Sequence, residues 1–99
     1  MFFIHKTPEF DKWLKKLKDL RAKAIILFRI VKLENDELFG DYKSVGGGIW
    51  EMRVNFAKGY RIYFKKQDDK IIVILIGGEK STQQKDIIKA KEIWKKLNS

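Results

Sequence analysis

Hydrophobic residues recur along this chain with two different periods, and the change between them falls near residue 49. Before that point they return every three or four positions, as on one face of a helix. Residues 49–56 and 60–66 then alternate between apolar and polar, which is typical of half-buried strands, and residues 71–76 form a continuous apolar run. Helical spacing returns toward the end of the chain. The pattern therefore predicts helices, then strands, then a helix.

The first part of the chain is predicted to form a short strand over residues 2–6 and two helices after it. Thr7 offers an N-cap hydroxyl and Pro8 suits the first helical position. Asp19 can cap the second helix, and we expect the two helices to form an antiparallel hairpin. The apolar positions of the first helix are Phe10, Trp13, Leu14 and Leu17, and those of the second are Leu20, Ala24, Leu27, Phe28 and Val31.

The middle of the chain is predicted to be a sheet. An acidic stretch over residues 34–41 ends the second helix, and we expect Gly46-Gly47-Gly48 to form a flexible loop. The two alternating segments and the apolar run follow, joined by turns at 57–59 and 67–70. Connections this short predict an antiparallel meander, in a sheet of three to four strands.

The last segment is predicted to be a helix that begins soon after the strand stops at Gly77. Ser81 or Thr82 can cap it, and Ser81 and Gln84 have the spacing of a capping box. Its apolar positions are Ile87, Ala90, Ile93 or Trp94, and Leu97. The resulting order, βααβββα, predicts one α+β domain over residues 1–99, with the helices on one face of a small antiparallel sheet.

The composition favours a polyanionic partner. Lysine and arginine number 22 against 13 acidic residues, a formal net charge of +9. Such a surplus attracts nucleic acid through counterion release, although it is also common in small basic proteins that bind none. The chain has no cysteine, and its start lacks the features of a signal peptide. No apolar run approaches the roughly 20 residues of a membrane helix, so we expect a cytoplasmic protein.

Polar residues on the two alternating segments are the first candidates for chemistry. Alternation places Glu51 and Arg53 on one side of the first segment, and Arg61 and Tyr63 on the corresponding side of the second. A cationic groove there suits single-stranded nucleic acid, because arginine grips phosphate with a fork of donors and Tyr63 can stack on bases. A solvated polar face held by cross-strand Glu–Arg pairs explains the same pattern.

Lys80 follows the glycine pair and precedes a predicted helix N-terminus, where an anion is favoured. The glycine spacing is not that of a nucleotide-binding P-loop, and a strand-to-helix turn also accounts for these residues. His5 is the only histidine, which excludes a histidine-pair ribonuclease and any site with two histidine ligands. The acidic stretch lacks calcium-loop spacing, and we expect no metal or cofactor. If RNA is cut here, cations must stabilise the pentacoordinate phosphate formed by the 2′-hydroxyl.

Six short motifs, in order along nearly the whole chain, resemble the RelE/ParE superfamily of toxin–antitoxin toxins. Within it they are similar to the addiction-module killer proteins close to HigB. The motifs are Thr7-Pro8-Glu9-Phe10-Asp11-x-Trp13-Leu14, Leu17-Lys18-Asp19, Gly46-Gly47-Gly48, Trp50-Glu51-Met52-Arg53, Gly59-Tyr60-Arg61-Ile62-Tyr63 and Gly77-Gly78-x-Lys80-x-x-Gln83-x-x-Asp86-Ile87.

The resemblance implies a small basic toxin that cleaves mRNA in the ribosomal A site until a cognate antitoxin, of the helix-turn-helix type, binds it. It implies RNA-cleaving roles for Arg61, Arg53 and Lys80. In that scheme Arg61 stabilises the transition state and Lys80 assists as a cation or proton carrier. Gln83 would contact substrate, and Glu51 would orient Arg53.

Two points leave the general acid and the activity of this chain open. RelE-type toxins often carry a tyrosine near the C-terminus as an acid, whereas this chain ends Lys95-Lys96-Leu97-Asn98-Ser99. Lys80 or Tyr63 must then be considered for that role. ParE-type toxins share the fold but poison DNA gyrase, so a gyrase poison and a non-catalytic nucleic-acid-binding module are the competing hypotheses.

Overall fold

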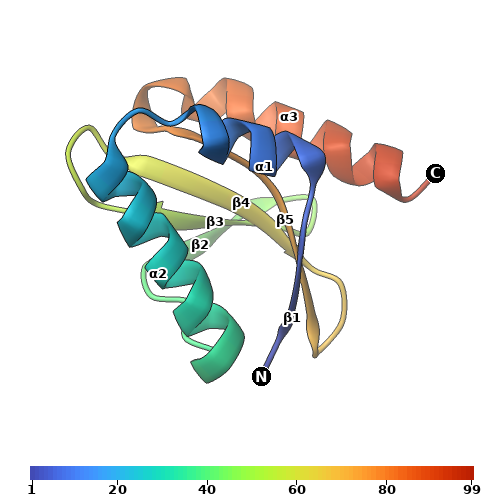
Figure 1. Cartoon of the computed structure of the whole chain (residues 1–99). Helices are drawn as coiled ribbons and strands as arrows, with labels where there is room; N and C mark the ends of the chain where they lie inside the picture. The colour runs from blue at the N-terminus through green and yellow to red at the C-terminus, as the bar shows by residue number, and fades with distance from the viewer.

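A five-stranded sheet with the strand order β1-β5-β4-β3-β2 forms the centre of the protein, in a computed structural model that describes residues 1–99 (Figure 1). The elements are β1 (Phe3–Lys6), α1 (Pro8–Lys16), α2 (Leu20–Asp36), β2 (Tyr42–Gly46), β3 (Ile49–Val54), β4 (Tyr60–Lys66), β5 (Ile71–Glu79), the 3-10 turn η1 (Lys80–Thr82) and α3 (Gln83–Leu97). This architecture confirms the α+β class. The antiparallel meander β3-β4-β5 is as predicted, and β1 adds to β5 as a parallel edge strand.

The two N-caps predicted in the first half of the chain are present. Thr7 Oγ1 accepts a hydrogen bond from the backbone N–H of Phe10 at 3.0 Å and donates one to the carbonyl of Leu75 at 2.6 Å, so it ties the start of α1 to β5. Asp19 accepts from the backbone N–H groups of Arg21 and Ala22. None of the three helices combines the length and apolar character that a membrane crossing requires.

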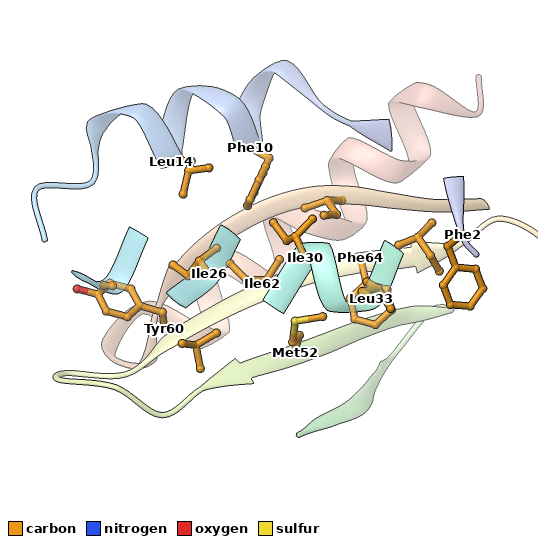
Figure 2. Close-up of a cluster of buried hydrophobic side chains, with 14 residues drawn as sticks. Phe2, Phe10, Leu14, Ile26, Ile30, Leu33, Met52, Tyr60, Ile62 and Phe64 are labelled. Carbon is orange, nitrogen blue, oxygen red and sulfur yellow. The ribbon is translucent and has the colours of Figure 1, made fainter. Parts of the chain in front are cut away.

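The helices lie on both faces of the sheet, which corrects the prediction that they share one face. The larger hydrophobic cluster joins α1 and α2 to one face through residues such as Phe10, Ile26 and Ile62 (Figure 2). A smaller cluster joins α3 to the opposite face through Ala90 and other side chains. Alternation along β4 and β5 supplies both clusters, because the strands at the centre of the sheet are apolar on both sides.

The buried face of α2 also differs from the prediction. Ala22, Ile26, Ile30 and Leu33 are buried, whereas all five positions of the predicted stripe are exposed. The sequence of α2 is apolar around most of its circumference, so periodicity offers two stripes, and the prediction selected the wrong one.

The predicted flexible glycine loop is part of a hairpin. Residues 42–46 form β2, which pairs with β3, and a register shift between Ser44 and Gly46 leads into the turn. Gly47 and Gly48 have φ of +63° and +76°, values that favour glycine in a tight turn. The strand escaped prediction because it is short, polar and mostly exposed at the sheet edge.

The glycine pair at 77–78 lies inside β5 rather than ending it, because the strand continues to Glu79. A Cβ atom on Gly77 would overlap the ring of Trp13 in α1, and one on Gly78 would overlap the carboxylate of Asp86 in α3. The pair therefore lets a helix approach β5 closely on each face. The predicted capping box is not formed. The turn η1 precedes α3, and Thr82 at its N-cap makes no side-chain capping bond.

Candidate functional site

The carboxylate of Glu51 lies at the centre of the polar residues that the sequence singled out. It is fully buried, and its Oε2 atom accepts hydrogen bonds from Tyr63 Oη at 3.1 Å and from Gln83 Nε2 at 2.7 Å. Its Oε1 atom accepts a 3.3 Å bond from Arg53 Nε and lies 3.9 Å from Arg61 Nε. One side chain of β3 thus contacts four of the five other predicted site residues.

Arg53 and Arg61 are direct cross-strand partners on β3 and β4. Like charges in that relation repel each other, so the pair depends on the Glu51 carboxylate beside it. Arg61 is 7% exposed, its Nη1 donates to the carbonyl of Tyr60 at 3.2 Å, and its buried Nε has no hydrogen-bond partner. The guanidinium of Arg61 is therefore held in place by the Tyr60 carbonyl and by its ion pair with Glu51.

The backbone behind Arg53 is fixed by Arg29, a residue that the sequence reasoning missed. Arg29 extends from α2, and its guanidinium donates to the carbonyls of Arg53 at 2.8 Å and Phe39 at 3.1 Å. Burial lowers the pKa of Arg29, and the charge of Asp41 opposes that shift. A lone arginine within a helix gives no sequence signal for such a long-range contact.

Tyr63 is fully buried between the sheet and α3, which contradicts the expectation that it stacks on bases. Burial raises the pKa of its phenol far above the usual value of 10, and the neighbouring Glu51 carboxylate raises it further. The phenol therefore stays protonated and donates to Glu51. Its position suits holding the carboxylate rather than touching a substrate.

Lys80 lies in the turn η1, and Gln83 is the first residue of α3. The backbone N–H of Lys80 donates to the carbonyl of Gly59 at 3.1 Å. A Cβ added to Gly59 would lie 3.4 Å from Lys80 Cβ and 3.9 Å from Arg61 Nη1, so both side chains border the same glycine. Lys80 and Gln83 also line a shallow depression of about 390 Å³ formed by residues 80–85. The structure thus brings Lys80 to the edge of the arginine pair.

Asp86 is a second residue that pattern reasoning did not assign to the site. Its carboxylate accepts a 2.5 Å hydrogen bond from Thr82 Oγ1 and packs against Gly78, the cross-strand partner of Arg61. A signal was present, since Gln83 and Asp86 are one helical turn apart and therefore share a face of α3. Asp86 helps to seat the start of α3 on the sheet. His5, by contrast, is exposed on β1, away from this cluster.

The cluster as a whole is positively charged. Arg53, Arg61 and Lys80 carry three charges, and the Glu51 carboxylate offsets one of them. Burial of the carboxylate and its four contacts keep the guanidiniums fixed. Such an arrangement can bind a phosphate and stabilise extra negative charge that develops on it, since the donors need no reorganisation.

In a comparison with known proteins, residues 12–95 match the family of phage-derived Gp49-like proteins (DUF891). An uncharacterized protein of Haemophilus influenzae (strain ATCC 51907 / DSM 11121 / KW20 / Rd) is 50% identical over 94 residues. That alignment covers 95% of this chain and 94% of the relative.

Three solved structures from Escherichia coli share this fold. A mutant of the toxin RelE in the free state has a TM-score of 0.67 at 13% identity, covering 91% of this chain and 93% of that one. A chain of the intact RelBE toxin–antitoxin complex has a TM-score of 0.66 at 16% identity, covering 80% and 96%. A mutant of YafQ has a TM-score of 0.61 at 16% identity, covering 84% and 98%. At these identities the likeness concerns the fold.

Proposed function

This chain belongs to the Gp49-like family of phage-derived proteins, and from that premise we propose that it is the toxin of a type II toxin–antitoxin pair. We propose further that it is a ribosome-dependent, metal-independent mRNA endonuclease that stops translation in the cytoplasm. The RelE-type fold supports the first statement, because the similar E. coli proteins are described as toxins. The cationic cluster around Glu51 supports the second.

The observation that carries the nuclease proposal is the pairing of Arg53 with Arg61 directly across two strands, with Lys80 beside them. Two guanidiniums placed opposite each other are unfavourable unless something negative lies near them. Glu51 offsets only one of the three positive charges. An RNA phosphate would complement the two that remain. A fold held together by ordinary cross-strand pairing needs no such surplus of fixed positive charge.

The proposed reaction uses the RNA's own 2′-hydroxyl as nucleophile. A bond forms between the 2′-oxygen and phosphorus, the bond from phosphorus to the 5′-oxygen breaks, and the products are a 2′,3′-cyclic phosphate and a 5′-hydroxyl. Arg61 and Arg53 stabilise the charge on the pentacoordinate phosphate. Lys80, the exposed cation of the three, supplies the proton that the 5′-oxygen takes up. Both oxygens of Glu51 are engaged, so the proton of the 2′-hydroxyl passes to solvent.

The proposed partners are the ribosome with its mRNA and a cognate antitoxin. RelE occurs in a complex described as toxin–antitoxin, and we carry that partnership over to this chain. A protein of the helix-turn-helix type, encoded by the adjacent gene, is the expected antitoxin. The net charge of +9 supports the ribosomal partner, since ribosomal RNA is a polyanion.

Growth inhibition tests the assignment of the site. Induced expression of the wild-type chain should arrest bacterial growth, whereas Arg61→Ala and Lys80→Ala should each abolish the arrest while keeping the circular dichroism spectrum. Lys96→Ala is the matched control, because it removes an exposed lysine near the other end of α3. Full toxicity of both site variants would refute the assignment. Loss of plasmid supercoiling with intact mRNA would instead indicate a gyrase poison.

A further inference from the structure

The solvent-facing side of α2 carries a stripe of large hydrophobic side chains. Leu20 is 74% exposed, Phe28 58%, Val31 46% and Leu27 38%. The small residue Ala24 completes the stripe and is also exposed. Figure 1 shows α2 at the outside of the molecule, with no other element beyond it. Contiguous apolar surface of this kind on a small protein marks an interaction site more often than single exposed residues do.

The spacing of this α2 stripe matches the seam of a coiled coil. Leu20, Ala24, Leu27 and Val31 are separated by four, three and four positions, which is the spacing of d, a, d and a in a heptad. Phe28 lies beside that seam. A seam with this period is complementary to one further helix, because its side chains alternate with holes into which a partner's side chains fit.

The charged residues that flank the α2 stripe indicate which charge the partner helix should have at its own flanking positions. Over its N-terminal half the flanking positions are basic, with Arg21 on one side and Lys23 on the other. Farther along, Lys32 is paired with Asp36 and lies over the ring of Phe28. A partner helix with acidic flanks would complement this half of the stripe.

We propose that the α2 stripe docks an amphipathic helix of the antitoxin, one with an apolar seam and acidic flanks. This inference rests on the proposed function for the existence of that partner. The stripe belongs to the face of the sheet that carries α1 and α2, and the cluster around Glu51 belongs to the α3 face. The helix therefore anchors the antitoxin away from the cations, and changes in the stripe should leave RNA cleavage intact.

The test compares two exposed apolar residues of nearly equal exposure on different helices. Phe28→Asp changes the stripe, and Ile88→Asp changes the outer face of α3, where Ile88 is 59% exposed. The probe is the protein encoded by the adjacent gene, titrated against each full-length variant. We expect Phe28→Asp to weaken binding about 10- to 100-fold and to remain toxic when that protein is co-expressed. Ile88→Asp should bind and be neutralised like the wild type.

Leu20→Glu is the second stripe variant, chosen because an acidic residue in the first turn of a helix favours folding. It should also weaken binding. Wild-type affinity of both stripe variants would overturn the docking site and leave the toxin–antitoxin proposal intact. A wild-type chain that is dimeric alone and becomes monomeric in Phe28→Asp would show that a second copy covers the stripe. No binding of the adjacent gene product to the wild type would overturn the docking site together with the proposed antitoxin.

Discussion

The side-chain amide of Gln83 donates a 2.7 Å hydrogen bond to the buried carboxylate of Glu51, 32 residues away in the sequence. This bond joins the first residue of α3 to the middle of β3. Lys80 lies on the turn just before α3, so the same contact sets the position of Lys80 relative to the arginines. Glu51 thus organises a site whose cations come from three separate segments of the chain.

Replacing Glu51 with glutamine should destabilise the protein by about 3 kcal/mol. The amide has only one acceptor oxygen, so its NH₂ group must face either the donors of Tyr63 and Gln83 or the guanidinium of Arg53. The two arginines would also lose the charge that offsets them. Urea unfolding at pH 7 measures the effect. Glu92→Gln, an exposed change on α3, should stay within about 0.5 kcal/mol of the wild type; an equally small effect of Glu51→Gln would contradict the central role of this carboxylate.

Tyr63→Phe should change the dependence of stability on pH. The pKa of Tyr63 is raised in the folded protein, so above pH 10 the unfolded chain releases this proton while the native chain keeps it. Wild-type stability should therefore fall, from this group alone, by about 1.4 kcal/mol per pH unit above pH 10. The phenylalanine variant lacks that contribution.

At neutral pH the same substitution should cost about 1.5 kcal/mol, because Glu51 loses one hydrogen bond. Denaturant unfolding of both proteins between pH 8 and 11 would reveal the difference, since every other titrating group is shared. We expect the variant to remain toxic, as the buried phenol does not reach a substrate. A folded but inactive Tyr63→Phe protein would instead assign Tyr63 to the chemistry.

Gly78→Ala should destabilise the protein by about 1–3 kcal/mol, because the added methyl group overlaps the carboxylate of Asp86. The clash is specific to that neighbour. In a double-mutant cycle, Asp86→Ala should therefore recover about 1 kcal/mol in the Gly78→Ala background. Thermal unfolding of the four proteins gives the coupling free energy. Strictly additive effects would mean that Gly78 is required for some reason other than the approach of α3.

The sequence was most informative where a local pattern determines the structure. The caps at Thr7 and Asp19 involve neighbouring residues, and alternation along β3 and β4 places Glu51, Arg53 and Arg61 on one side of the sheet. These features require only the period of a strand and the chemistry of a helix start. The α+β class followed from them.

Prediction was wrong where tertiary contacts decide. The choice between the two apolar stripes of α2 depends on what packs against it, and the role of the glycine pair at 77–78 depends on Trp13 and Asp86 from other elements. The contact of Gln83 with Glu51 links residues that share no local pattern. The resemblance to RelE-type toxins placed both residues in one site but could not indicate that Glu51 is its buried centre.

Mapping the 5′ ends of mRNA in a cell-free translation reaction is the most direct test of the proposed activity. We predict codon-phased cuts that appear with wild-type protein only when ribosomes are present, with a 5′-hydroxyl on each downstream fragment. Arg61→Ala should reduce the cleavage rate about 10²- to 10³-fold. Intact mRNA in the presence of ribosomes and folded wild-type protein, or equal cleavage by Arg61→Ala, would contradict this proposal.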